Sequence, residues 1–223
     1  MKKPLLVGFS AAALLLLAAP AFAGMAVSVS GNGQIVPAPS NAALDTNKLY
    51  QVWNETSGTL STTFTVENNG ADGSYTGASP GTSTTLTAGT AYGSTMIQLN
   101  PGVNGQIGSG TATILFSTPI IGIALSDSSL NNTDHPYGAP STTYPTGLTG
   151  RGIAPKTNQL FTITDGGKEL EVHFTAQYDS LREIRVFTAG VSSIPEPASV
   201  VVWSLLGGVA ACGRWVRRRR VAV

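Results

Sequence analysis

The sequence predicts an all-β fold for the central part of the chain, and three observations support this class. Short runs rich in Val, Ile, Thr and aromatic residues recur from end to end, and clusters of Gly, Pro, Asn and Asp separate them. Charged residues make up only 11% of the chain, which leaves little material for amphipathic helices with a solvated charged face. No internal stretch shows a sustained helical period. We expect a β-sandwich of the jelly-roll or Ig type.

The expected strands cover residues 26–30, 48–54, 60–67, 82–87, 94–99, 111–117, 120–125, 159–164, 168–176 and 181–188. Turn signals between them include Asn-Asn-Gly at 68–70, Ser-Pro-Gly at 79–81, Asn-Pro-Gly at 100–102 and Asp-Gly-Gly at 165–167. The last predicts a hairpin, because Asp-Gly accepts positive φ between paired strands. In the strand that follows it, Leu170, Val172 and Phe174 alternate with polar residues, which predicts one buried face and one solvated face.

The first residues show the three parts of a Sec signal peptide. Lys2 and Lys3 make a positive start, residues 5–19 are apolar, and Ala21 and Ala23 are the small residues before a cut. The apolar run is short for a span of about 20 residues, which favours a cleaved leader over a permanent anchor. We therefore predict a signal helix, export, and cleavage after Ala23.

Residues 194–223 also have three parts in order: a Pro-Glu-Pro motif, an apolar stretch and an arginine-rich end. Pro195 and Pro197 lack amide donors and bias the residues before them to extended conformations, so we expect the motif, with Glu196 at its centre, to be accessible. A transmembrane helix is predicted over residues 198–213. The positive-inside rule places the end of the chain in the cytoplasm. The arginines that set this topology are Arg214, Arg217, Arg218, Arg219 and Arg220.

This tripartite tail resembles the PEP-CTERM sorting signal of bacteria that encode an exosortase, and the resemblance is limited to this tail together with the signal peptide. It implies that the tail holds the protein briefly at the inner membrane until exosortase cuts near Pro195, Glu196 and Pro197. Signal peptidase and exosortase are then the expected partners, with extracellular polysaccharide as a further one. The expected location is the cell envelope, the cell surface or the extracellular space. A plain tail anchor with a proline-rich linker is the alternative.

These signals divide the chain into a signal peptide (1–23), a β-sandwich passenger domain (24–193) and a sorting tail (194–223). Between residues 24 and 194, six cations face eleven acids, a formal charge of −5. This segment has no basic cluster, which argues against nucleic acid as a partner. Cys212, the one cysteine, belongs to the tail, so the passenger domain depends on its core rather than on disulfides.

Two groups of residues have the composition of a metal site. His173 stands two positions from Glu171 on one strand face, but a solvated polar face is the expected interpretation. Residues 126–144 form an expected long polar loop, and oxygen-rich loops can hold Ca²⁺. Its candidate ligands are Asp127, Asn131, Asn132, Asp134 and His135. Their spacing matches no EF-hand, so we expect an ordinary surface loop, with no metal and no cofactor.

Catalytic motifs are missing from the sequence: it has no G-x-S-x-G, no H-E-x-x-H and no P-loop. We therefore predict that the protein is not an enzyme. The leading hypothesis is a structural or binding protein of the envelope or matrix. The alternative is a carbohydrate-binding module, and a hydrolase with acids about 5–10 Å apart in a cleft is a further one. The sugar-binding candidates are the aromatic residues Trp53, Tyr75, Tyr92, Tyr137 and Tyr144.

Overall fold

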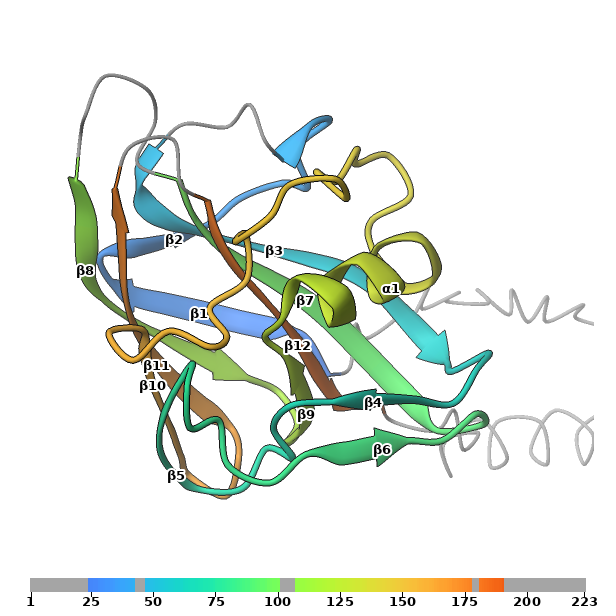
Figure 1. Cartoon of the computed structure of the whole chain (residues 1–223). Coiled ribbons are helices and arrows are strands. Elements are labelled where there is room, and N and C mark those ends of the chain that lie inside the picture. Colours follow the sequence, from blue (N-terminus) through green and yellow to red (C-terminus); the bar gives the residue numbers. More distant parts are fainter. Residues whose placement is uncertain (1–23, 43–46, 101–106, 178–180, 191–223) are drawn as a thin grey trace, which may run out of the picture.

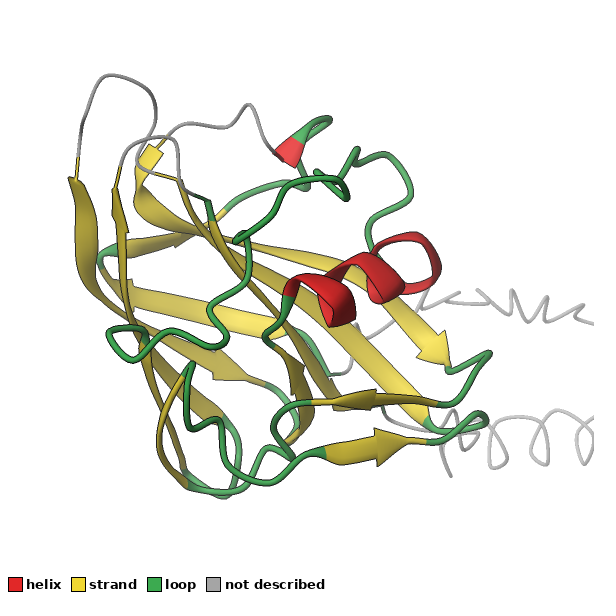
Figure 2. Ribbon diagram, viewed as in Figure 1, coloured by secondary structure: helices red, strands yellow, loops and turns green. Residues whose placement is uncertain are grey.

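The computed structural model describes residues 24–42, 47–100, 107–177 and 181–190, and within these ranges the chain is an all-β fold with one α-helix (Figures 1 and 2). The predicted all-β class is confirmed. The elements are β1 (Ala26–Gly31), β2 (Gly33–Ile35), β3 (Asn47–Thr59), β4 (Phe64–Val66), β5 (Gly73–Thr76), β6 (Thr84–Leu86), β7 (Ala91–Asn100), β8 (Ile107–Phe116), β9 (Ile120–Ala124), α1 (Asp127–Tyr137), β10 (Leu160–Thr164), β11 (Glu169–Gln177) and β12 (Arg182–Ala189).

The strands form two five-stranded sheets and one small one. Sheet A has the order β1-β8-β11-β10-β5, and sheet B has the order β2-β3-β7-β12-β9. The pairings within both are antiparallel except that β2 runs parallel to β3. Strands β4 and β6 form the two-stranded sheet. Every run predicted as a strand overlaps an observed one, whereas β2 and β5 are additional.

Two hydrophobic clusters lie on opposite faces of sheet B. The first lies between the two large sheets and joins side chains of β3, β7 and β12 to side chains of β8, β10 and β11. The second lies on the other face of sheet B, where Trp53, Met96 and Phe187 pack under side chains of α1, β4 and β6. Sheet B is therefore covered on both faces, which explains why most residues of β7 and β12 are buried.

Strand β11 confirms the predicted alternation. Leu170, Val172 and Phe174 are fully buried, whereas Glu171 and His173 are exposed. The predicted hairpin is confirmed as well, since β10 and β11 pair antiparallel around the turn at 165–167. All three turn residues have positive φ, between 55° and 82°. The exposed His173 contacts Thr111 across the ladder, at 3.2 Å between Nδ1 and Oγ1, as expected of a polar sheet face.

The expected loop over residues 126–144 is wrong in its first half, because Asp127–Tyr137 is helical. Ser126 caps this helix by accepting a hydrogen bond from the Ser129 amide at 3.2 Å. Glu67 lies beneath the same end and accepts hydrogen bonds from the Leu125 amide and from the Ser126 and Ser129 hydroxyls. Helix formation here depends on a cap and on a carboxylate that is distant in sequence, so periodicity alone did not predict it.

The two described ends of the chain meet at one place. Gly24 donates its amide hydrogen to Ser117 Oγ at 2.9 Å and is buried. A Cβ at Gly24 would stand 2.7 Å from the carbonyl oxygen of Ala189, at the end of β12. Gly190 donates its amide hydrogen to the Ala91 carbonyl at 2.9 Å, beside Gly93, which itself packs against Gly24. Residues 24 and 190 thus leave the fold side by side.

The predicted signal peptide with Ala21 and Ala23, the Pro195-Glu196-Pro197 motif, the 198–213 helix and the terminal arginines all lie outside the described residues. Within the described ranges, no helix combines the length and the apolar character needed to span a bilayer.

Candidate functional site

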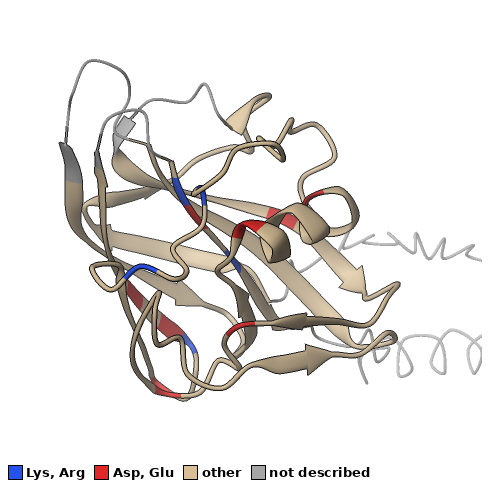
Figure 3. Cartoon of the chain, in the orientation of Figure 1, with Lys and Arg blue, Asp and Glu red and all other residues tan. Residues whose placement is uncertain are grey.

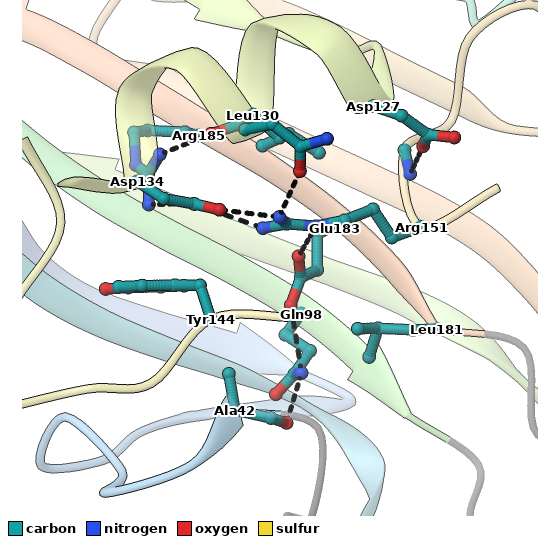
Figure 4. A network of polar contacts seen from close by, with 12 residues as sticks. Ala42, Gln98, Asp127, Leu130, Asp134, Tyr144, Arg151, Leu181, Glu183 and Arg185 are labelled. Carbon is teal, nitrogen blue, oxygen red and sulfur yellow. Dashed lines mark hydrogen bonds and ion pairs between the residues drawn. The ribbon is translucent and has the colours of Figure 1, made fainter. Parts of the chain in front are cut away.

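A buried network of charged side chains lies where α1 crosses sheet B (Figure 4). Figure 3 marks the positions of the charged residues along the ribbon. Strand β12 supplies Glu183 and Arg185, which share a face because they are two residues apart. Glu55 comes from β3 and Asp134 from α1, whereas Arg151 belongs to the segment between α1 and β10. All five side chains are at most 3% exposed.

Arg185 binds Glu55 in a two-pronged geometry. Its Nε lies 2.7 Å from Glu55 Oε2, and its second terminal nitrogen lies 2.9 Å from Glu55 Oε1. That same nitrogen is 3.0 Å from Asp134 Oδ1, and the other donates to Thr133 Oγ1 at 2.7 Å. The guanidinium also stacks over the Tyr144 ring, 5.1 Å from its centroid. Such bidentate, charge-assisted bonds are the strong and directional ones.

Arg151 occupies the other side of Asp134. Its terminal nitrogens lie 2.6 and 3.2 Å from the two carboxylate oxygens of Asp134, and its Nε lies 2.6 Å from Glu183 Oε2. It also donates to Asn131 Oδ1 at 3.0 Å. Asp134 therefore bridges the two arginines, and it joins the helix to a strand and to an irregular segment at once.

Neutral side chains complete the bonding of the carboxylates. The Tyr144 hydroxyl donates to Glu55 and accepts from the Ala139 amide, and Ser94 Oγ donates to Glu55 at 2.7 Å. On the other side of the network, Gln98 Nε2 donates to Glu183 Oε1 at 3.2 Å. The Tyr144 contact with Glu55 holds the segment that follows α1 against the outer face of sheet B, whereas the Ser94 and Gln98 contacts join neighbouring strands of that sheet.

Burial and mutual attraction act together on the protonation of this network. Burial alone would lower the pKa of both arginines, but the adjacent carboxylates raise it above the ordinary value. Burial raises the pKa of Glu183, and Arg151 opposes that shift. Burial, with Glu55 beside it, also raises the pKa of the Tyr144 hydroxyl. Both guanidiniums are therefore charged and the tyrosine is neutral at ordinary pH.

This arrangement is suited to holding elements together. Each carboxylate oxygen faces a guanidinium or another donor, so the geometry gives no carboxylate a free direction toward a substrate. The three carboxylates and two guanidiniums join β3, β12, α1 and the segment after α1. Buried pairs of this kind are costly to break, because loss of one partner leaves the other charge without compensation.

The predicted calcium candidates do not come together as a ligand set. Asp134 and Asn131 bind Arg151, and Asp127 accepts the amide hydrogens of Gly150 and Gly152. Asn132 and His135 are exposed on the helix. In the part of the chain that the structure describes, no three His, Cys, Asp or Glu side chains gather into a possible metal centre.

The candidate sugar-binding aromatics form no exposed platform. Trp53, Tyr92 and Tyr137 are at most 6% exposed, and the Tyr92 and Tyr137 rings meet edge to face at 77° in the second hydrophobic cluster. Tyr75 packs on Phe161, and Tyr144 lies over Arg185. Four of these five rings belong to the packing of the fold or of the network, and Tyr75 packs against the core.

The sequence analysis did not predict that four of the charged residues would meet in one buried network: Glu55, Arg151, Glu183 and Arg185. The available signal was the run 182–187, where Glu183 and Arg185 alternate with Ile184 and Val186 although Phe187 follows directly. A strand with apolar residues on both faces is buried on both sides, so its charges need buried partners.

No protein-family model, no curated protein and no solved structure matches this chain. The resemblance of the tail to PEP-CTERM signals therefore stays a prediction from its residues.

Proposed function

We propose that this chain is an exported structural or binding protein of the bacterial envelope or extracellular matrix, without enzymatic activity. The observation that carries the structural role is the buried network, in which the carboxylates are engaged by arginines, hydroxyls and an amide. Polar groups that are committed to one another in this way support a rigid scaffold rather than a reaction centre, where a group must stay free to exchange protons.

The delivery route in this proposal comes from the two ends of the sequence. Signal peptidase cuts after Ala23, residues 198–213 hold the chain in the inner membrane, and exosortase cuts near Pro195-Glu196-Pro197. Extracellular polysaccharide surrounds the released protein. In this proposal the two large sheets form a jelly-roll-like or Ig-like sandwich, and the shared core between them supports that assignment.

The test is intact-mass and C-terminal peptide analysis of the protein recovered from its native cells. The expected mature form starts at Gly24, ends near residues 195–197, and is found outside the membrane fraction. A form that keeps Arg217 to Arg220 and stays in the inner membrane would mean a permanent anchor and would refute exosortase processing.

A variant pair makes the test specific to the motif. Replacing Glu196 by Ala should block release, whereas Ser193→Ala, just before the motif, should leave release unchanged.

The proposal that the protein has no enzymatic activity is tested by incubating the recovered protein with polysaccharide from the same cells. New reducing ends, absent from a boiled control, would contradict it.

A further inference from the structure

We draw no further inference here: the strongest candidate, the exposed outer face of sheet A, where Glu171 and His173 of β11 lie among hydroxyl side chains of β8 and β10, carries no proposal because nothing in the structure shows what covers it.

Discussion

Arg185 donates hydrogen bonds from two nitrogens to the carboxylate of Glu55, although the two residues are 130 positions apart in the sequence. This contact joins β12 to β3 across the intervening strand β7, because β7 lies between them in sheet B. The arrangement of β3, β7 and β12 is thus stabilised by side chains on the outer face of sheet B as well as by the backbone hydrogen bonds between the strands. The strength of this pair can be measured directly.

Removing one member of the pair should destabilise the fold by about 3–5 kcal/mol, because the other charge stays buried. Arg185→Met and Glu55→Gln should each do so in urea unfolding. The double variant should cost less than the sum of the two, which measures their coupling. Glu171→Gln is the control, since Glu171 is exposed on β11. Similar small effects for all three single variants would show that the network contributes little.

High pH should weaken the fold through its buried tyrosines. Burial raises the pKa of the hydroxyls of Tyr50 and Tyr144 in the folded state above the ordinary value of 10.0. The unfolded chain loses these protons first, so the free energy of unfolding falls as pH rises above about 10. Absorbance at 295 nm should show the two hydroxyls ionising only as the protein unfolds. Tyr144→Phe should reduce the slope, and ionisation of every tyrosine in the folded state would contradict the prediction.

Two glycines with positive φ separate backbone strain from steric conflict. Gly70 and Gly89 have φ of 76° and 91°, but a Cβ at Gly70 would lie 2.3 Å from the Ile120 carbonyl, whereas one at Gly89 meets nothing within 4 Å. Gly89→Ala should cost roughly 1–2 kcal/mol from strain alone. Gly70→Ala should cost about 1–3 kcal/mol more, because packed atoms must shift. Equal losses in thermal unfolding would show that the backbone near Ile120 relaxes freely.

The start of α1 should depend on its cap. Ser126→Ala removes the hydroxyl that accepts from the Ser129 amide and donates to Glu67, so we expect a loss of about 1 kcal/mol or more. Asn132→Ala, on the exposed side of the helix, should change stability by less than about 0.5 kcal/mol. Urea unfolding of both variants checks this prediction. Equal losses of stability in the two variants would show that the Ser126 cap does not stabilise the helix.

The sequence was informative where structure is local. The Asp165-Gly166-Gly167 turn and the alternation on β11 were predictable, because turn chemistry and a period of two depend on neighbours in the chain. Strands β2 and β5, of three and four residues, are too short to show a period.

The network and α1 were not predictable for a related reason. The buried face of the helix consists of Leu130, Thr133, Asp134 and Tyr137, of which two are polar, and Pro136 lies within it. Such a face has the sequence pattern of a surface loop. Asp134 is buried because Arg151 and Arg185 meet it there, and a single sequence does not show which distant charges will pair.

The proximity of residues 24 and 190 has a consequence for protein engineering. Whatever precedes Gly24 and whatever follows Gly190 attach at neighbouring points, where Gly24 lies against Ala189. A short linker between these points would close the chain into a ring, and new termini could then be opened at an exposed turn such as 87–90. The domain could likewise be inserted as a single unit into a loop of a host protein, since its entry and exit need no separation.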